Sequence, residues 1–210
     1  MNPRIRTAIS RGVLACALGV AAIVGPASTW GQTTAVVEST RTTAATVSAT
    51  PEVKGIPRFS EIEPGLARGG QPNHDGYQFL RDHGYKTVVS FRKGNDDERR
   101  ELERMGIRYI EIPLRAGPFS ATPPTDDDLL KFFTTLGDSA RRPVFIHCLR
   151  GRDRTGAMTA LYRIQACRWT NEDAVKEMKE HGFRGHYKKL KKFVREYVPR
   201  ESFAAVSAAP

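Results

Sequence analysis

The stretch FIHCLRGRDRTG, residues 145–156, decides both the fold and the chemistry of this chain. It begins within an apolar run, 143–147, which predicts a buried strand, and helical apolar spacing follows it at Met158, Leu161 and Ile164. The loop between strand and helix places one cysteine among three arginines. Because a structural thiol has no need of so much positive charge, the loop indicates a reactive site.

The loop from Cys148 to Arg154 has the features of an anion-binding site. Successive backbone N–H groups at a helix N-terminus can converge on one point and hold an anion. Gly151 allows a sharp turn because it has no Cβ. The planar guanidinium of Arg154 matches two phosphate oxygens. We expect this loop to wrap one phosphoryl group.

The same surroundings predict an ionised thiol at Cys148. Loop amides and a helix N-terminus lower the pKa of a cysteine below its free value of about 8.5, and the thiolate is the competent nucleophile. The sulfur would attack phosphorus and form a phosphocysteine, which water then hydrolyses. Thr155 can donate a hydrogen bond to the sulfur, and His147 is expected to orient the loop. Positioning and electrostatic stabilisation would supply most of the catalysis.

Residues 147–156, HCLRGRDRTG, resemble the HCxxGxxRTG loop of the atypical dual-specificity branch of the protein tyrosine phosphatase superfamily, in its bacterial secreted form. Segments 66–72 and 88–92 are similar to the opening strands of that superfamily, and the resemblance covers most of 56–198. It implies a hydrolase of phosphate monoesters, of the protein tyrosine or dual-specificity type. The catalytic residues are then Cys148, Arg154, Asp153 and Thr155, and the phosphate-binding loop adds His147, Leu149, Arg150, Gly151, Arg152 and Gly156.

The rest of the chain alternates short apolar runs with helical stretches. We expect strands at 66–68, 87–91, 107–112 and 143–147. We expect helices at 73–83, from Asn95 with Glu98 as a capping-box variant, from Thr125, from Thr155, from Thr170 and at 185–198. This alternation implies an α/β fold, a three-layer sandwich with a central, mainly parallel sheet of about four to five strands flanked by helices. In such sheets ligands bind beyond the carboxyl ends of the strands, where the loop lies.

Residues 1–31 have the outline of a secretory signal peptide, with a basic start, an apolar run and small residues near 26–28. We expect cleavage near 27–31 and a secreted or periplasmic protein, with an uncleaved N-terminal anchor as the alternative. Residues 32–55, rich in Thr, Ala and Ser, are expected to form a flexible linker. The phosphatase domain is then 56–198, and 199–210 is expected to be a disordered tail.

The sequence departs from the family at the general acid. The family supplies an aspartate from a mobile loop upstream of the cysteine, where this chain has IPLRAGPF, 112–119, without a carboxylate. One candidate is the run of Asp126, Asp127 and Asp128, which could equally cap a helix and complement its dipole. The other is Asp153, whose place resembles that of the loop aspartate in myotubularin-like and Sac-like phosphatases. It could protonate the leaving oxygen or hold a neighbouring arginine.

Arg150 and Arg152 bear on the substrate. Plant and fungal members that act on inositol pyrophosphates similarly carry a basic loop, so an inositol phosphate or phosphoinositide is the alternative to a phosphoprotein. The two arginines could also face solvent. A catalytically weak, phosphate-binding pseudophosphatase is the alternative of another class, suggested by the absent loop acid.

The net charge of +10 is compatible with anionic partners of several kinds. The basic residues are not interleaved with aromatics as in single-strand binders, so we expect no nucleic-acid partner. The segment 187–195 either packs its apolar side in the core or makes peripheral contact with an anionic membrane. We expect a monomer.

The cysteines downstream of the signal segment are Cys148 and Cys167. If the helix from Thr155 is continuous, Cys167 lies about 18 Å along it at roughly 1.5 Å per residue. A disulfide needs Cα atoms about 4.4–6.8 Å apart. We therefore expect two free thiols. The sequence contains neither metal-ligand spacing nor a dinucleotide-binding loop, so we expect no metal and no cofactor.

Overall fold

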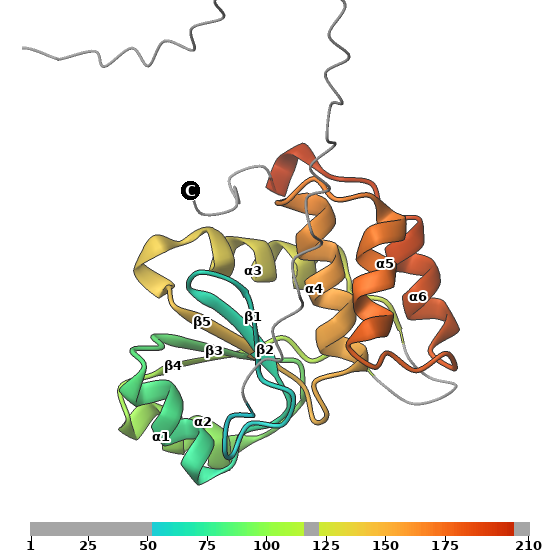
Figure 1. The fold of residues 1–210 in the computed structure, drawn as a ribbon. Coiled ribbons are helices and arrows are strands. Elements are labelled where there is room, and N and C mark those ends of the chain that lie inside the picture. Colours follow the sequence, from blue (N-terminus) through green and yellow to red (C-terminus); the bar gives the residue numbers. More distant parts are fainter. Residues whose placement is uncertain (1–51, 116–121, 204–210) are drawn as a thin grey trace, which may run out of the picture. The chain divides into compact units, whose positions relative to one another are not determined.

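A computed structural model describes residues 52–115 and 122–203 of the chain, which form a five-stranded sheet with helices on both faces (Figure 1). The expected signal segment, most of the expected linker, residues 116–121 and the end of the chain lie outside the described residues. The strands are β1 (Ser60–Glu63), β2 (Leu66–Gly69), β3 (Thr87–Ser90), β4 (Arg108–Glu111) and β5 (Val144–His147). The helices are α1 (His74–Asp82), α2 (Asp96–Arg104), α3 (Asp126–Gly137), α4 (Asp153–Gln165), α5 (Asn171–Glu180) and α6 (Lys188–Arg195), with short 3-10 turns at Ser139–Arg141 and Glu201–Phe203.

The strand order is β1-β2-β5-β3-β4, with β1 antiparallel to β2 and the other neighbours parallel. Helices α1 and α2 lie on one side of the sheet, and α3 to α6 lie on the other (Figure 1). The residues of β5 alternate between these faces: Phe145 packs on the side of Tyr77 and Leu80 of α1, whereas Ile146 joins the core beneath α3 to α6. The expected three-layer α/β sandwich with a mainly parallel sheet is confirmed.

Strand β1 was not expected from the sequence. Its four residues, SEIE, include one apolar side chain that reaches the core, Ile62, so periodicity carries little signal there. The strand is held by its antiparallel pairing with β2 across a tight turn at Gly65, whose φ of +77° favours glycine.

Helix starts are largely as expected. Thr125 accepts a hydrogen bond from the N–H of Asp128 and forms a full capping box with it, while Asn73 and Thr170 cap α1 and α5. The capping-box interpretation of Asn95 was wrong: within the described residues its side chain makes no capping hydrogen bond. Its Nδ2 instead donates to Glu98, which turns into the interior.

The packed chain continues past the expected domain limit at residue 198. Gln165 donates to the carbonyl of Arg200 and accepts from its N–H. Phe203 is buried, with its ring 5.2 Å from that of Phe133. The described part of the expected tail, 199–203, is therefore folded against α3 and α4. Across 52–115 and 122–203, no helix is both long enough and apolar enough to cross a bilayer.

Candidate active site

The loop of residues 148–152 links the carboxyl end of the central strand β5 to the N-terminus of α4. Gly151 turns the chain with a φ of +68°, as expected. Cys148 is buried, 3% exposed, at a pocket of about 90 Å³. The pocket is lined by Cys148, Leu149, Arg150, Asp153, Arg154, Arg184 and Tyr187. The structure thus brings together most of the residues that the sequence indicated, at the edge where a parallel sheet binds ligands.

The surroundings of the Cys148 thiol favour its ionised form, which is the nucleophile. Burial raises its pKa, but hydrogen bonds from the Thr155 hydroxyl and N–H, the charge of Arg154 and the N–H of Arg150 together outweigh burial and lower it below the ordinary value. The buried hydroxyl of Thr155 has no regular hydrogen-bond partner within the described residues, so no other group competes with the sulfur for its proton.

Arg154 is held by the ends of two neighbouring strands. Its Nη1 donates to the carbonyl of Phe91, just after β3, at 2.6 Å, and to that of Leu114, beyond β4, at 3.3 Å. These bonds set the plane of the guanidinium at the pocket. A fork held in this way can bind a phosphoryl group without losing much side-chain freedom.

Arg184 and Tyr187 line the pocket but were not identified from the sequence. The backbone N–H of Arg184 donates to Asp153 Oδ1 at 2.9 Å, and its guanidinium donates to Oδ2 at 2.8 and 3.0 Å. Its Nη2 also donates to the Tyr187 hydroxyl at 2.8 Å. Asp153 thereby uses both carboxylate oxygens to hold a further cation at the pocket. Because Arg184 follows α5, 31 residues after Asp153, local sequence carries no sign of this pairing.

The side chains of the two additional loop arginines, Arg150 and Arg152, lie in different hollows. Arg150 lines the pocket of Cys148, whereas Arg152 lines a different hollow of about 270 Å³ together with Arg58, Glu180 and His181. The interpretation that both arginines face one polyanion is therefore wrong for the side chain of Arg152. Gly151, which lies between them, has a φ of +68°, so the chain turns there and the spacing of two residues does not keep the two side chains on one side.

His147 is fully buried and contacts Glu98, with His147 Nε2 3.0 Å from Glu98 Oε1. Glu98 also accepts hydrogen bonds from Gln71, Tyr77 and Asn95. Burial raises the pKa of Glu98, but the bonds from His147, Gln71 and Tyr77 outweigh it and lower the pKa below its ordinary value. This buried network ties the residue before the cysteine to α1 and α2, which supports the expected orienting role of His147.

Acidic residues in the first turn of α3 are engaged in other contacts. Asp128 belongs to the capping box of Thr125, and Asp126 forms an ion pair with Arg200 at 2.7 Å. These contacts favour the capping and dipole interpretation over a general acid. Most of the upstream loop, 116–121, lies outside the described residues.

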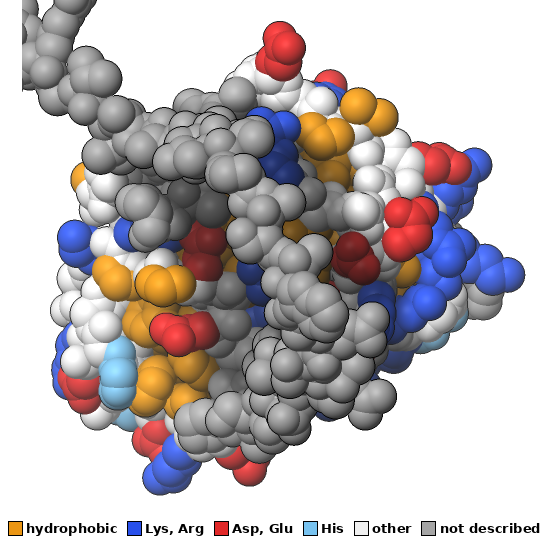
Figure 2. Space-filling view, turned by 45° about the horizontal axis from the view of Figure 1, so that its top comes forward, with side chains coloured by type: hydrophobic (Ala, Val, Ile, Leu, Met, Phe, Trp, Pro, Cys, Tyr) orange, Lys and Arg blue, Asp and Glu red, His pale blue; other side chains and the backbone are white. Residues whose placement is uncertain are grey.

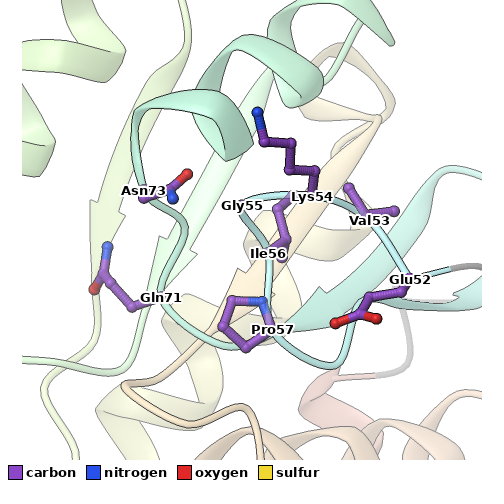
Figure 3. Close-up of a pocket in the computed structure, with 8 residues that line it drawn as sticks. All are labelled: Glu52, Val53, Lys54, Gly55, Ile56, Pro57, Gln71 and Asn73. Atoms are coloured by element: carbon purple, nitrogen blue, oxygen red, sulfur yellow. The ribbon is translucent and has the colours of Figure 1, made fainter.

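Three further features of the described residues bear on the site. Both cysteines in the described part of the chain, Cys148 and Cys167, are free thiols, as expected. Gly156 lets α5 approach α4, since a Cβ there would lie 3.1 Å from the side chain of Met178. A larger hollow, of about 590 Å³, lies elsewhere, along 52–57 with Gln71 and Asn73 (Figure 3).

Comparison with known proteins agrees with this geometry. The family model described as "PTP-NADK: DSP-PTPase phosphatase fused to NAD+ Kinase" matches residues 35–196. The dual specificity protein phosphatase TpbA of Pseudomonas aeruginosa PAO1 is 31% identical over 174 residues, 82% of this chain and 72% of TpbA. The chain belongs to the dual-specificity branch of the protein tyrosine phosphatase superfamily. The predicted superfamily with its dual-specificity branch, and the predicted enzyme class, a cysteine-dependent phosphatase, are confirmed.

The relatives differ in how much of them is matched. TpbA of strain UCBPP-PA14 is 34% identical over 123 residues, 58% of this chain and 53% of that protein. The inositol diphosphatase DSP3 of Arabidopsis thaliana is 26% identical over 50% of this chain and 53% of its own length. The matched region thus spans about half of these two relatives.

Solved structures show the same fold. The crystal structure of P. aeruginosa TpbA gives a TM-score of 0.56 at 29% identity, over 67% of this chain and 84% of that chain. The catalytic core of Siw14 gives a TM-score of 0.62 at 19% identity, over 71% of this chain and 89% of that chain. The second likeness bears on the fold alone.

Proposed function

We propose that this protein hydrolyses phosphate monoesters through a phosphocysteine at Cys148. The observation that carries the proposal is the buried sulfur at the pocket, with its pKa lowered by Thr155, Arg154 and loop amides. A thiolate in this position is both nucleophile and, after transfer, leaving group. The proposed reaction uses the chain's own residues and water.

In the first step the sulfur of Cys148 attacks phosphorus, an S–P bond forms and the P–O bond to the leaving group breaks. Arg154 and the loop N–H groups stabilise the charge on the transferring phosphoryl oxygens. Water then attacks phosphorus, and a P–O bond forms as the S–P bond breaks. The proton of water leaves with the inorganic phosphate, and Cys148 returns to the thiolate, to which the Thr155 hydroxyl donates a hydrogen bond. A pseudophosphatase would keep the binding and lack both steps.

For Asp153 we propose an anchoring role. Both oxygens of the Asp153 carboxylate accept hydrogen bonds from Arg184, so both are already engaged in holding that side chain. Asp153 then places Arg184 at the pocket, and substrates with good leaving groups, such as aryl phosphates, react without a strong acid. The acid role predicts that loss of activity in Asp153→Asn grows as the leaving group becomes more basic, whereas the anchoring role predicts an equal loss for all leaving groups.

Phosphotyrosine is the substrate that we propose first. Pockets that enclose a whole small molecule hold about 300–1,000 Å³. The pocket of about 90 Å³ therefore takes the phosphoryl group and leaves the rest of the substrate at the rim. Leu149, 49% exposed, offers an apolar surface at that rim to an aromatic ring. TpbA, 29% identical in its matched structure, has been solved as a cysteine-to-serine variant in complex with phosphotyrosine.

An inositol phosphate or phosphoinositide is the second candidate. Arg150 and Arg184 add two guanidinium groups at the pocket beyond Arg154, and Arg184 is paired there with Asp153. A substrate with neighbouring phosphates would use them through charge-assisted hydrogen bonds. The relationship to an inositol diphosphatase supports the same possibility.

We propose that the basic side of α6 is where anionic partners approach. Lys188, Lys189, Lys192 and Arg195 are exposed, while Leu190 and Val194 are buried in the core. The charges of Arg195 and Lys179 lower the pKa of Lys191, a sign of crowded positive charge. In Figure 2, Lys and Arg side chains gather at the edge of the molecule where α5 and α6 lie in Figure 1.

Because the apolar residues of α6 face the core, contact with an anionic membrane would be electrostatic and without insertion. Co-sedimentation with phosphatidylserine vesicles at low salt tests this contact. The variant Lys188→Glu/Lys192→Glu should lose it, and Arg104→Glu/Arg108→Glu, with the same charge change on exposed residues outside α5 and α6, should keep it. Equal binding by both variants would contradict the proposed surface.

For localisation we propose export, on the basis of the signal-like segment 1–31. The function itself is tested by hydrolysis of p-nitrophenyl phosphate beside a Cys148→Ser control. The proposal predicts turnover in the wild type and none in the control, together with a phosphorylated Cys148 peptide after rapid acid quenching. Equal rates in both proteins would remove the enzyme, and vanadate binding without turnover would identify a pseudophosphatase.

A further inference from the structure

The outer face of the phosphate-binding loop rests on the residues that follow β2. Three successive loop carbonyls accept hydrogen bonds from this side: Leu149 O from the N–H of Gln71 at 3.3 Å, Arg150 O from Arg58 Nη1 at 3.5 Å and Gly151 O from Arg68 Nη2 at 3.1 Å. The contact is close. A Cβ on Gly151 would lie 2.5 Å from the carbonyl carbon of Gly69 and 2.5 Å from the nitrogen of Gly70.

These bonds decide which way the loop amides point. In a trans peptide the N–H points away from the carbonyl of the same plane. Because the carbonyls of Leu149, Arg150 and Gly151 point outward, the N–H groups of the residues that follow them point into the loop. The lowering of the Cys148 pKa by the Arg150 N–H agrees with this direction.

The supporting segment is itself held from outside. Gly70 donates to the carbonyl of Pro57 at 2.6 Å, and Asn73 donates to that of Gly55 at 3.0 Å. Figure 3 shows residues 52–57 passing beside the segment that carries Gln71 and Asn73. The loop amides are therefore positioned by a layered backbone rather than by the loop alone.

Arg68 stands out in this arrangement because it is a buried cation. It is 2% exposed, and its Nε and Nη1 have no hydrogen-bond partner among residues 52–115 and 122–203. Burial lowers its pKa to about 10, which the charges of Glu177 and Cys148 only partly oppose. Glu177 is already bonded to Arg163.

The place of Arg68 is unfavourable for folding alone. Its Nη2 lies 3.7 Å from the position of a Cβ on Gly156, in the first turn of α4, where the helix dipole is already positive. A cation with unmet donors at that end of a helix destabilises the fold unless an anion is nearby. The thiolate of Cys148 and a bound phosphoryl group are the anions that this location offers.

We propose that Arg68 is a positioning residue of the phosphatase, which aims the Gly151–Arg152 amide at the phosphoryl group and places a buried positive charge behind the anion. The inference rests on the proposed phosphocysteine chemistry. Arg68 acts through the loop backbone and through its field, and it need not touch the substrate.

The test compares Arg68→Met and Arg68→Lys with Arg142→Met, which removes a partly buried arginine paired with Glu63 at the opposite end of β5. Three quantities are measured: the pH midpoint of Cys148 alkylation, vanadate affinity by calorimetry and unfolding in urea. For Arg68→Met we expect a midpoint higher by about one pH unit, the size of effect that a nearby charge has. We expect vanadate affinity about 10- to 100-fold weaker, as for the loss of an interaction with a charged group, and stability equal to or above wild type.

Arg68→Lys, which keeps the charge without the fork, should lie between wild type and Arg68→Met in midpoint and affinity. Arg142→Met should be less stable than wild type and keep the wild-type alkylation midpoint and vanadate affinity. The proposal is overturned if Arg68→Met keeps the wild-type midpoint and vanadate affinity. It is also overturned if Arg68→Met is unfolded while Arg68→Lys is folded with both quantities unchanged. Vanadate binding needs no turnover, so failure of the proposed hydrolysis in wild type would be seen separately.

Discussion

Replacing Glu98 by glutamine would probe the buried network behind the cysteine most sharply. Glu98 is 2% exposed and receives four contacts, from His147, Gln71, Tyr77 and Asn95. The glutamine amide has no charge, and its NH2 group is a donor where the carboxylate has an acceptor oxygen. If the NH2 group of the glutamine faces Asn95, two donors oppose each other there. The amide oxygen then keeps its three contacts with His147, Gln71 and Tyr77, which are weaker because the oxygen is uncharged.

The magnitude follows from these contacts. A hydrogen bond to a charged group stabilises by roughly 1 kcal/mol more than a neutral one, and a buried polar group left unpaired costs about 1–3 kcal/mol. Three weakened bonds and one lost partner give a destabilisation of about 4–6 kcal/mol, or roughly 8–24 °C in Tm for a domain of this size. The direction in which this stabilisation changes with pH is also defined. Because the pKa of Glu98 is lowered from 4.5, its stabilisation is complete above about pH 4.5 and is lost as the pH falls through the lowered value.

Urea unfolding at pH 7 and at pH 4 measures both effects. Glu98→Gln should be less stable at pH 7, and this difference from wild type should shrink toward pH 4 and below. Glu103→Gln, on the same helix but exposed, should stay within about 0.5 kcal/mol of wild type. A Glu98→Gln protein within about 1 kcal/mol of wild type at pH 7 would refute the reasoning, because the network would then contribute little.

Three other predictions concern the loop and the core. Arg150→Ala should raise the steady-state KM for an inositol polyphosphate about 10-fold or more, as for the loss of a charge-assisted bond. Arg152→Ala should change this KM less than about threefold, because Arg152 lines another hollow. Equal effects of the two variants on KM would contradict the separation of the two side chains. Gly151→Ala should abolish vanadate binding in calorimetry and destabilise by about 3 kcal/mol, because of the φ of +68° and the 2.5 Å contacts; wild-type affinity would show that the loop can relax. Phe203→Ala should cost about 3 kcal/mol in urea unfolding, and a neutral effect would mean that residues 199–203 do not pack as described.

The sequence was most informative where one element follows directly from local pattern. The apolar run of β5, the glycine turn and the helical spacing of α4 together place Cys148 at the carboxyl end of a central strand, and the structure has them so. The start of α3 likewise follows from local sequence, because Thr125 caps the helix as predicted. In contrast, the edge strand β1 carries one core residue, Ile62, and its pairing rather than its pattern defines it.

What the sequence could not provide are contacts between distant segments. Glu98 has the spacing of a helix cap, yet it turns inward because His147 and Gln71 offer a buried set of donors. Arg184 reaches the pocket because Asp153 binds it across 31 residues. The buried place of Arg68, beside a loop 83 residues later in the chain, likewise depends on the alignment of β2 with β5.

The most direct test of the account is the alkylation rate of each cysteine in the purified protein as a function of pH, read by mass spectrometry of the Cys148 and Cys167 peptides. Cys167 serves as an internal reference, since burial raises its pKa while the surroundings of Cys148 lower its own. The account predicts that Cys148 reaches half of its maximal rate below the free-thiol value of about 8.5, that Cys167 does so above it, and that vanadate protects Cys148 alone. Coincident midpoints for the two thiols, with no protection by vanadate, would contradict it.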